Sequence, residues 1–294
     1  MIRSWSDYTN CLDHVDVAFH STMNTLTITG LSISLGALVL SLMVFFSFPS
    51  LHCTRITLHK NMFFSMAMNN ISWLLWYHLV LFNPSVWSVN SFWCRLLHIM
   101  TTYFMLTTYF WMLCEGTYLR MILVKTFIEE ESWIWWFVIL GWVVPVIVLA
   151  PYTLFRLGYE NQLCWMDNGK SIIFLAIPAI CPILINIYCL CDVIRILRSK
   201  LIFENSFNKN NHNITMKSAR AALILIPVFG LHFLLLPMRP AKGSSMEFVY
   251  EVVSSISTST QGLFVSFLLC FTNDDVLFHI KKRLLRVRKL LEIL

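Results

Sequence analysis

The chain has 294 residues, of which 57% are hydrophobic and 13% are charged. Its mean hydropathy is +0.66. A soluble domain carries about 25% charged residues and roughly 45–50% apolar ones, so this composition excludes an ordinary soluble protein and indicates an integral membrane protein. The formal net charge of +6 would indicate a nucleic-acid partner only if the basic residues shared one solvent-exposed face. We therefore expect no nucleic-acid partner.

Apolar runs long enough to cross about 30 Å of hydrocarbon recur along the chain. In chain order they cover 22–48, 56–83, 92–126, 132–156, 171–201, 214–238 and 246–271. Pro, Gly, Asn and charged residues separate them, as is typical of turns. The sequence therefore predicts an all-α membrane protein with a bundle of seven transmembrane helices over 22–272, preceded by an extracellular segment 1–21.

Lys and Arg are distributed unequally between the two sides of this bundle. Sixteen lie in loops, helix ends and the tail on one side, and six lie on the other. This bias places the amino terminus outside and the carboxyl terminus in the cytoplasm. The tail 273–294 has apolar positions at helical spacing and a basic opposite face, which predicts a short amphipathic helix in contact with membrane lipid.

The nine cysteines form no C-x-x-C pair and no cluster with His at metal-ligand spacing. We find no nucleophile–base pair and no nucleotide-binding loop, so neither an enzyme, a metal site nor a cofactor is expected. Cys94 opens the third span and Cys164 precedes the fifth, both on the oxidising outer face, where they can join. The alternative is two free thiols. Cys11 has no evident partner within the chain.

Glu115 is the carboxylate of the third apolar run, in YFWMLCEGTYL. It follows Cys94 by 21 residues, which is about 31 Å of helix, so it sits near the inner end of the hydrocarbon. Arg55 and His59 lie four residues apart on one face of the second span, at the same depth. We predict an inner polar network of Arg55, His59 and Glu115. The alternative is that each side chain snorkels separately to the headgroups.

Pro227 and Gly230 interrupt the sixth span midway and predict a kink that could act as a hinge. Asn186, Gln261 and Gly262 are further polar or small positions suited to helix contacts. Their spacing alone does not separate function from packing. No Lys occurs in the seventh span, which excludes a retinal Schiff base, and no paired-carboxylate relay crosses the bundle, which favours a receptor over a pump.

Motifs over nearly the whole chain resemble those of secretin-like (class B) G-protein-coupled receptors. The chain carries RITLHKN, YFWMLCEGTYL, GW-x-x-P, NQLCW, ILIP-x-x-G and QGL-x-V-x-x-x-x-CF-x-N. It lacks the D-R-Y motif of rhodopsin-like receptors. RITLHKN, LPMRPAKG and VYEVV are similar to the calcitonin-receptor group, particularly the calcitonin-like diuretic hormone receptors of invertebrates.

The resemblance implies a plasma-membrane receptor for an amidated, calcitonin-like peptide hormone. Such a receptor couples to the stimulatory G protein and raises cyclic AMP by outward opening of the sixth helix, and some relatives need a single-span accessory protein. By the same resemblance, Cys94 and Cys164 match the family's loop disulfide. The positions that match the family's contact with the G protein are Lys200, Leu201, Lys217 and Asn273.

The remaining matches and departures concern the inner half of the bundle and the amino terminus. The family's inner network matches Arg55, His59 and Glu115, and its activation hinge matches Pro227 and Gly230. A Thr and a Tyr that often complete this network are replaced by Ala222 and Leu269. The usual disulfide-bonded hormone domain is missing, so we expect a fragment in which 1–21 is a remnant of it. The alternative is a truncated, non-signalling partner of a full-length receptor.

Overall fold

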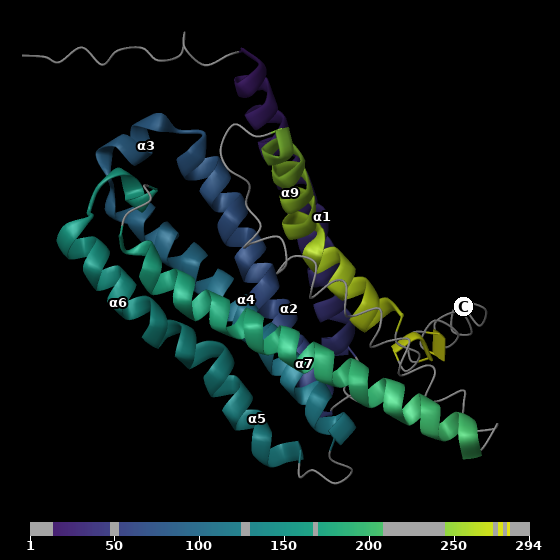
Figure 1. Ribbon diagram of the computed structural model, residues 1–294. Coiled ribbons are helices and arrows are strands. Elements are labelled where there is room, and N and C mark those ends of the chain that lie inside the picture. Colours follow the sequence, from purple (N-terminus) through teal and green to yellow (C-terminus); the bar gives the residue numbers. More distant parts are fainter. Residues whose placement is uncertain are drawn as a thin grey trace, which may run out of the picture.

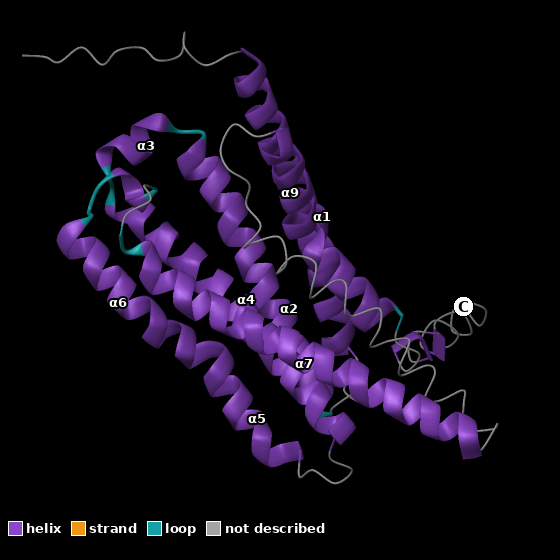
Figure 2. Cartoon of the chain, viewed as in Figure 1, coloured by secondary structure: helices purple, strands orange, loops and turns teal. Residues whose placement is uncertain are grey.

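The computed structural model describes residues 14–47, 53–124, 130–166, 170–207, 245–272, 276–278 and 281–282. All regular structure within these ranges is helical (Figures 1 and 2). The long helices are α1 His14–Ser47, α2 Thr54–Trp76, α4 Phe92–Val124, α5 Glu130–Val138, α6 Val144–Tyr159, α7 Ile172–Phe207 and α9 Ser245–Ser266. Helix α3 is a short helix, Pro84–Val89, between α2 and α4.

In the part of the chain that the structure describes, three helices contain a π-helical turn, in which each backbone hydrogen bond spans five residues instead of four. These turns are η3 Tyr77–Leu81 after α2, η4 Ile139–Val143 between α5 and α6, and η7 Phe267–Phe271 after α9. Because η4 joins α5 to α6 without a break, residues 130–159 form one continuous helix. Such insertions are frequent at functional sites and bends.

Helices coincide with six of the predicted spans, and the sixth span, 214–238, lies outside the described residues. The main differences are at the ends. Helix α1 begins at His14, inside the segment predicted as 1–21, and α7 continues to Phe207 rather than ending at 201. Hydropathy locates the part of a helix that lies in lipid, whereas backbone hydrogen bonding continues beyond the bilayer surface.

Within the described ranges, four helical segments are long and apolar enough to cross a membrane by length and composition. They are Ser21–Ser47, Trp133–Tyr159, Ile173–Ile196 and Met246–Phe271. Helices α2 and α4 are not among them. Both contain charged residues and bury many side chains against neighbouring helices, and a helix surrounded by protein need not be apolar all round.

Helix α4 lies at the centre of the bundle, in contact with α2, α6 and α7. Helix α9 packs along α1, and both begin at the same end of the bundle (Figure 1). We call the end that holds Cys94, at the start of α4, the disulfide end. The main apolar core includes Leu38, Phe63 and Trp111, which are all fully buried.

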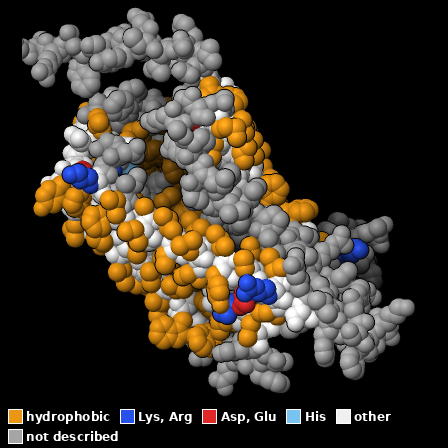
Figure 3. All heavy atoms as spheres, in the orientation of Figure 1, with side chains coloured by type: hydrophobic (Ala, Val, Ile, Leu, Met, Phe, Trp, Pro, Cys, Tyr) orange, Lys and Arg blue, Asp and Glu red, His pale blue; other side chains and the backbone are white. Residues whose placement is uncertain are grey.

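The surface of the bundle is largely apolar. Figure 3 shows hydrophobic side chains covering the face over α5, α6 and α7. Trp135 and Trp136 are 71% and 66% exposed, and Leu154 is 70% exposed. An apolar surface of this extent in a helical chain is typical of a protein that faces lipid, with Trp near one boundary of the hydrocarbon.

Candidate functional site

The predicted inner network contains a buried acid–base pair between α2 and α4. His59 Nδ1 lies 2.7 Å from Glu115 Oε1. The two residues are 5% and 9% exposed, respectively. Because a carboxylate can only accept, Nδ1 donates the hydrogen bond. A buried pair of this kind is costly to break, since removing one partner leaves the other polar group buried without compensation.

Aromatic rings from α1 and α2 enclose the pair. The ring centroids of Phe45 and Phe63 lie 6.3 Å and 6.5 Å from that of His59. This apolar surrounding lowers the local dielectric and strengthens the bond between His59 and Glu115. Arg55, the third predicted member, lies one turn earlier on α2 with an exposed side chain. The structure therefore brings His59 and Glu115 together at the end opposite to the disulfide end.

A second ionic contact at this end joins α4 to α7. Arg120 Nε donates to Asp192 Oδ2 at 2.5 Å, and the Arg120 guanidinium lies 5.4 Å from the ring centroid of Tyr188. In the sequence, Arg120 is only one of the sixteen basic residues on the inner side, and neither it nor Asp192 was predicted to take part in a contact. A carboxylate inside the apolar run of α7, at a depth similar to that of an arginine on α4, was the available signal.

The three predicted helix-contact residues all lie at helix interfaces. Asn186 is 9% exposed on α7, and its Oδ1 would lie 2.7 Å from a Cβ added to Gly116 of α4. Gln261 on α9 donates from Nε2 to the sulfur of Met112 at 3.4 Å. Gly262 allows α9 to approach α1, because a Cβ there would lie 2.4 Å from Ser34 Oγ. All three residues therefore lie where helices meet.

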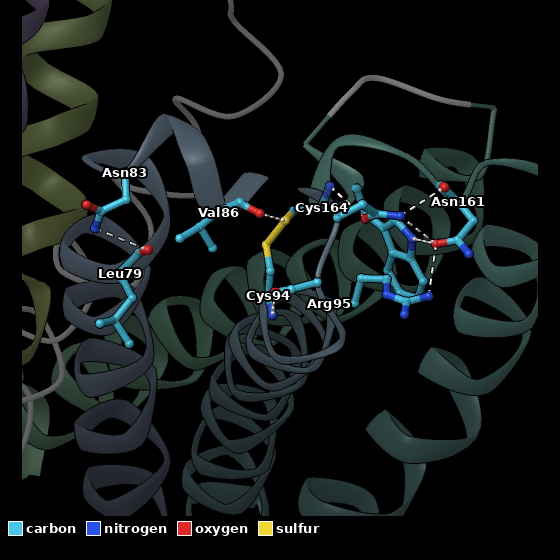
Figure 4. Close-up of a disulfide and its surroundings, with 10 residues drawn as sticks. Leu79, Asn83, Val86, Cys94, Arg95, Asn161 and Cys164 are labelled. Carbon is cyan, nitrogen blue, oxygen red and sulfur yellow. Dashed lines mark hydrogen bonds between the residues drawn. A yellow bond between two sulfur atoms is a disulfide. The ribbon is translucent and has the colours of Figure 1, made fainter. Parts of the chain in front are cut away.

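The disulfide end is held by a bond between Cys94, at the start of α4, and Cys164, in the loop before α7 (Figure 4). The pairing predicted from the sequence is thus present, with a Cα–Cα distance of 5.7 Å. Both cysteines are almost fully buried. The bond fixes the loop to the first turn of the central helix.

Near the disulfide, the side chain of Asn161 accepts hydrogen bonds from residues in separate parts of the chain (Figure 4). Its Oδ1 accepts hydrogen bonds from Arg95 Nη1 at 3.1 Å, from Trp165 Nε1 at 3.2 Å and from Asn90 Nδ2 at 3.2 Å. Asn90 Oδ1 in turn accepts from the backbone N–H of Cys164 at 3.0 Å. These bonds connect the start of α4 with the loop on both sides of the disulfide.

The loop itself takes an unusual backbone form. Leu163, Cys164 and Trp165 have φ of 49°, 51° and 62°, in the left-handed region. Each such residue costs about 1–2 kcal/mol when it is not glycine. The surrounding contacts offset this strain: Trp165 is 1% exposed and packs on Tyr152. No local sequence signal indicates three consecutive left-handed residues.

Glu160 closes the other end of this loop by capping the start of α7. Its carboxylate accepts from Ser171 Oγ at 2.6 Å and from the backbone N–H of Lys170 at 2.7 Å. Arg156, which is 2% exposed, faces it at 3.6 Å. The hydrogen bond from Ser171 above all, together with that from Lys170 and the charge of Arg156, holds the pKa of Glu160 below its ordinary value.

Several predicted residues cannot be placed. Lys200 and Leu201 belong to α7, of which only the backbone is described at these positions. The predictions for Lys217, Ala222, Pro227, Gly230 and Asn273 fall outside the described residues. Within the described ranges, no three His, Cys, Asp or Glu side chains gather at metal-binding distance.

Comparison with known proteins assigns a family. Residues 20–265 match the family model of the 7 transmembrane receptor (Secretin family). The chain is 35% identical over 277 residues to a calcitonin gene-related peptide type 1 receptor of Oncorhynchus gorbuscha, and the match covers 93% of this chain and 59% of that protein. The corresponding receptor of Xenopus tropicalis is 35% identical over 283 residues, covering 95% and 59%.

The human calcitonin receptor is 30% identical over 289 residues, which cover 96% of this chain and 59% of that receptor. The chain thus spans less than two thirds of the length of these relatives. The match covers the helical region, including the acid–base pair and both disulfide cysteines. The resemblance predicted from the motifs is confirmed: the chain belongs to the secretin family of seven-transmembrane receptors, with calcitonin and calcitonin gene-related peptide receptors among its relatives.

Proposed function

We propose that the chain is the transmembrane part of a receptor for a calcitonin-like peptide hormone in the plasma membrane. It couples to the stimulatory G protein and raises cyclic AMP. The observation that carries the proposal is the buried pair of His59 and Glu115, 2.7 Å apart, inside a region that matches the receptor family from residue 20 to 265. A buried pair of ionisable side chains at this depth is retained for function more readily than for stability.

The positions of the helix ends support seven spans. Phe207 ends α7 far from the disulfide end, whereas Ser245 begins α9 close to the start of α1 (Figure 1). The proposal places the predicted sixth span between them, as a further crossing of the bilayer. The predicted apolar run 214–238 is long enough for that crossing. Seven crossings leave the two termini on opposite sides, and the excess of basic residues puts the carboxyl terminus in the cytoplasm.

The mechanism follows from the two ends of the bundle. The peptide enters at the disulfide end, which is outside, and the G protein binds at the opposite end. There the contact between His59 and Glu115 holds α2 to α4. Outward movement of the sixth helix about Pro227 and Gly230 opens a site for the G protein, formed with Lys200, Leu201, Lys217 and Asn273.

The further partners follow from the same assignment. Membrane lipid surrounds the apolar faces and receives the basic side of the tail helix, where Lys281 and Lys282 are exposed. A single-span accessory protein of the kind implied by the resemblance would lie beside the bundle. Amidation of the hormone is also part of the proposal, and the family resemblance is its only support.

The experiment places the chain behind the amino-terminal region of the human calcitonin receptor and expresses it in cells that report cyclic AMP. Calcitonin-like and calcitonin gene-related peptides, amidated and free, are applied with and without an accessory protein. We expect at least one amidated peptide to raise cyclic AMP, and the rise to disappear in cells that lack the stimulatory α subunit. Chimeras that reach the surface and answer to no peptide would contradict the proposal and favour a non-signalling partner role.

A pair of variants tests the acid–base pair itself. Glu115→Gln removes the charge that binds His59 and should raise basal cyclic AMP, because the closed end loses a charge-assisted hydrogen bond of about 1.5–3 kcal/mol. Glu251→Gln, near the start of α9, removes a carboxylate of the same charge at the disulfide end and is the matched control. Equal basal signals from the two variants would count against the role of Glu115.

A further inference from the structure

Arg120 on α4 and Asp192 on α7 form an ion pair that the mechanism above does not use. Arg120 Nε donates to Asp192 Oδ2, and the guanidinium lies 5.4 Å from the ring centroid of Tyr188. The two charged side chains are 38% and 23% exposed, so the pair lies at the surface of the bundle. A surface ion pair contributes little to the stability of a fold. Stability alone therefore gives little reason for these two charges.

The surface around the pair is apolar. Figure 3 shows Lys, Arg, Asp and Glu side chains gathered over α7, with hydrophobic side chains around them. Leu184 and Tyr188, on α7 just before Asp192, are 60% and 58% exposed. A face of this kind is covered by lipid. Charged groups on it must therefore lie at the polar boundary of the bilayer or bind a polar partner there.

Two helices place the pair at the level of the lipid headgroups. Arg120 follows Cys94 by 26 residues, which is about 39 Å of α4. Asp192 follows Ile172, the first residue of α7, by 20 residues, which is about 30 Å. The hydrocarbon is about 30 Å thick, and the bilayer with both headgroup layers about 40–45 Å. Since helical side chains lean back toward the start of their helix, the Arg120 guanidinium lies in the headgroup layer at the end opposite to the disulfide end.

Arg120 has donors left for a ligand in that layer. Its Nε binds Asp192, whereas Nη1 and Nη2 make no hydrogen bond to any residue that the structure describes. Asp192 and Tyr188 hold the guanidinium plane in one orientation. A guanidinium held in this way offers parallel N–H donors to two oxygens of a phosphate group. Arg195 is exposed three residues after Asp192, on the same face of α7, and adds a second cation.

We propose that Arg120 and Arg195 bind the phosphate of an anionic glycerophospholipid in the leaflet at this end, and that Asp192 is a positioning residue that orients Arg120. Two guanidinium groups and one carboxylate leave a net positive charge. This charge favours a headgroup with a net negative charge over phosphatidylcholine, whose choline cancels the charge of its phosphate. Basic sites between helices near the membrane surface bind anionic headgroups in this way. The binding does not rest on the proposed function, and its tests use no hormone.

The alternative is that Arg120 is only a structural partner of Asp192. A structural ion pair stabilises the chain to the same extent in every lipid. A headgroup site adds a stabilisation that appears only when the lipid is present, because the lipid binds the folded chain. The change in Tm between two lipid compositions therefore separates the two interpretations, since the stability lost with the ion pair itself cancels in this difference.

The first test measures thermal unfolding of the purified chain in nanodiscs of phosphatidylcholine, alone or with one fifth phosphatidylglycerol. If the anionic lipid exceeds its dissociation constant about tenfold, the Tm of the wild type should rise by about 3–6 °C. Arg120→Gln and Arg195→Gln should each lose at least half of this rise. Lys60→Gln removes a cation at the same end of the bundle, which lies over the ring of Phe46, and is the matched control. It should keep the rise.

Arg195→Gln keeps the test decisive if Arg120→Gln folds poorly, because Arg195 is exposed and lies outside the ion pair. The proposal is overturned if the wild type shows no rise in Tm with phosphatidylglycerol. It is also overturned if an arginine variant that folds keeps the full rise, or if Lys60→Gln loses as much of it as the arginine variants do.

A second measurement separates a lipid from a free phosphate. Inorganic phosphate and glycerol phosphate, added at millimolar concentration to the phosphatidylcholine nanodiscs, offer the same oxygens without acyl chains and should leave Tm unchanged. A rise that depends on Arg120 would show a site for free anions and overturn the lipid assignment. Native mass spectrometry of the chain purified from the mixed lipid should find one bound phosphatidylglycerol that Arg120→Gln lacks. Equal occupancy in the two would contradict the proposal.

Discussion

Replacing Gly262 by Ala adds one methyl group where α9 meets α1. The new Cβ would lie 2.4 Å from Ser34 Oγ and 2.6 Å from Leu38 Cδ1, closer than van der Waals contact permits. Both neighbours are fully buried, so neither can turn into open space. Gly36, on α1, is the matched control, because a Cβ there meets nothing within 4 Å.

The magnitude is clearest in the difference between the two variants. Each gains helix propensity of up to about 1 kcal/mol, and this gain cancels in the comparison. What remains is the overpacking at Gly262, which costs about 1–3 kcal/mol in a well-packed interior. At roughly 2–4 °C per kcal/mol, Gly262→Ala should melt about 2–12 °C below Gly36→Ala.

The assay is thermal unfolding of the purified chain in detergent, followed by helical circular dichroism. Adding Leu38→Ala to Gly262→Ala removes the atom 2.6 Å from the new Cβ. The double variant should therefore lose less than the sum of its single changes. If Gly262→Ala melts with Gly36→Ala, or if the two changes at the interface simply add, the close approach of α1 and α9 does not depend on this glycine.

Two further predictions concern the sixth helix and the loop before α7. Replacing Pro227 and Gly230 together by Ala should straighten the helix and depress hormone-driven cyclic AMP at unchanged surface expression, and full signalling would refute the hinge. The folded-state pKa of Glu160 is lowered, chiefly by the hydrogen bond from Ser171. The carboxylate therefore stabilises the fold at pH values above its ordinary pKa, and this contribution is lost as the pH falls through the lowered pKa. Glu160→Gln should therefore lower Tm at pH 7 and flatten the fall in Tm below about pH 4.3; a parallel curve would show that the cap contributes nothing.

The inner pair could be predicted because it depends on helix geometry alone. A span that starts at Cys94 carries Glu115 to a depth fixed by the rise per residue. Helical spacing puts Arg55 and His59 on one face of the next helix. What spacing could not decide was how deeply each of the two side chains is buried. Packing against Phe45 and Phe63 buries His59, whereas the Arg55 side chain is exposed.

The contacts that sequence reasoning missed depend on tertiary structure. The ion pair of Arg120 and Asp192 requires the relative rotation of α4 and α7, which no local pattern contains. The left-handed turn around Cys164 is imposed by the disulfide and by Asn161, against the preference of its own residues. The π-helical turns also depend on tertiary packing. Nothing in the sequence ILGWV indicates a π-helical turn, whereas in the structure Gly141 lies against the ring of Trp111.

Leu269 lies in η7 and is packed, partly buried, against the apolar core around the inner pair. It therefore offers no hydrogen bond where the family resemblance implies a Tyr hydroxyl. Ala222, where the resemblance implies a Thr, lies outside the described residues. If both hydroxyls normally join Glu115 and hold the inner ends closed, this chain lacks up to two such bonds.

Each neutral hydrogen bond contributes about 0.5–1.5 kcal/mol net, so the two together would shift a resting equilibrium by roughly tenfold or more. Basal cyclic AMP should accordingly be high, and Ala222→Thr with Leu269→Tyr should lower it in the chimera at equal surface expression. Leu269→Met, which keeps the position apolar at similar volume, is the control and should leave the basal signal high. A basal signal that stays the same or rises in the double variant would mean that Ala222 and Leu269 are ordinary packing, and that His59 and Glu115 hold the closed state by themselves.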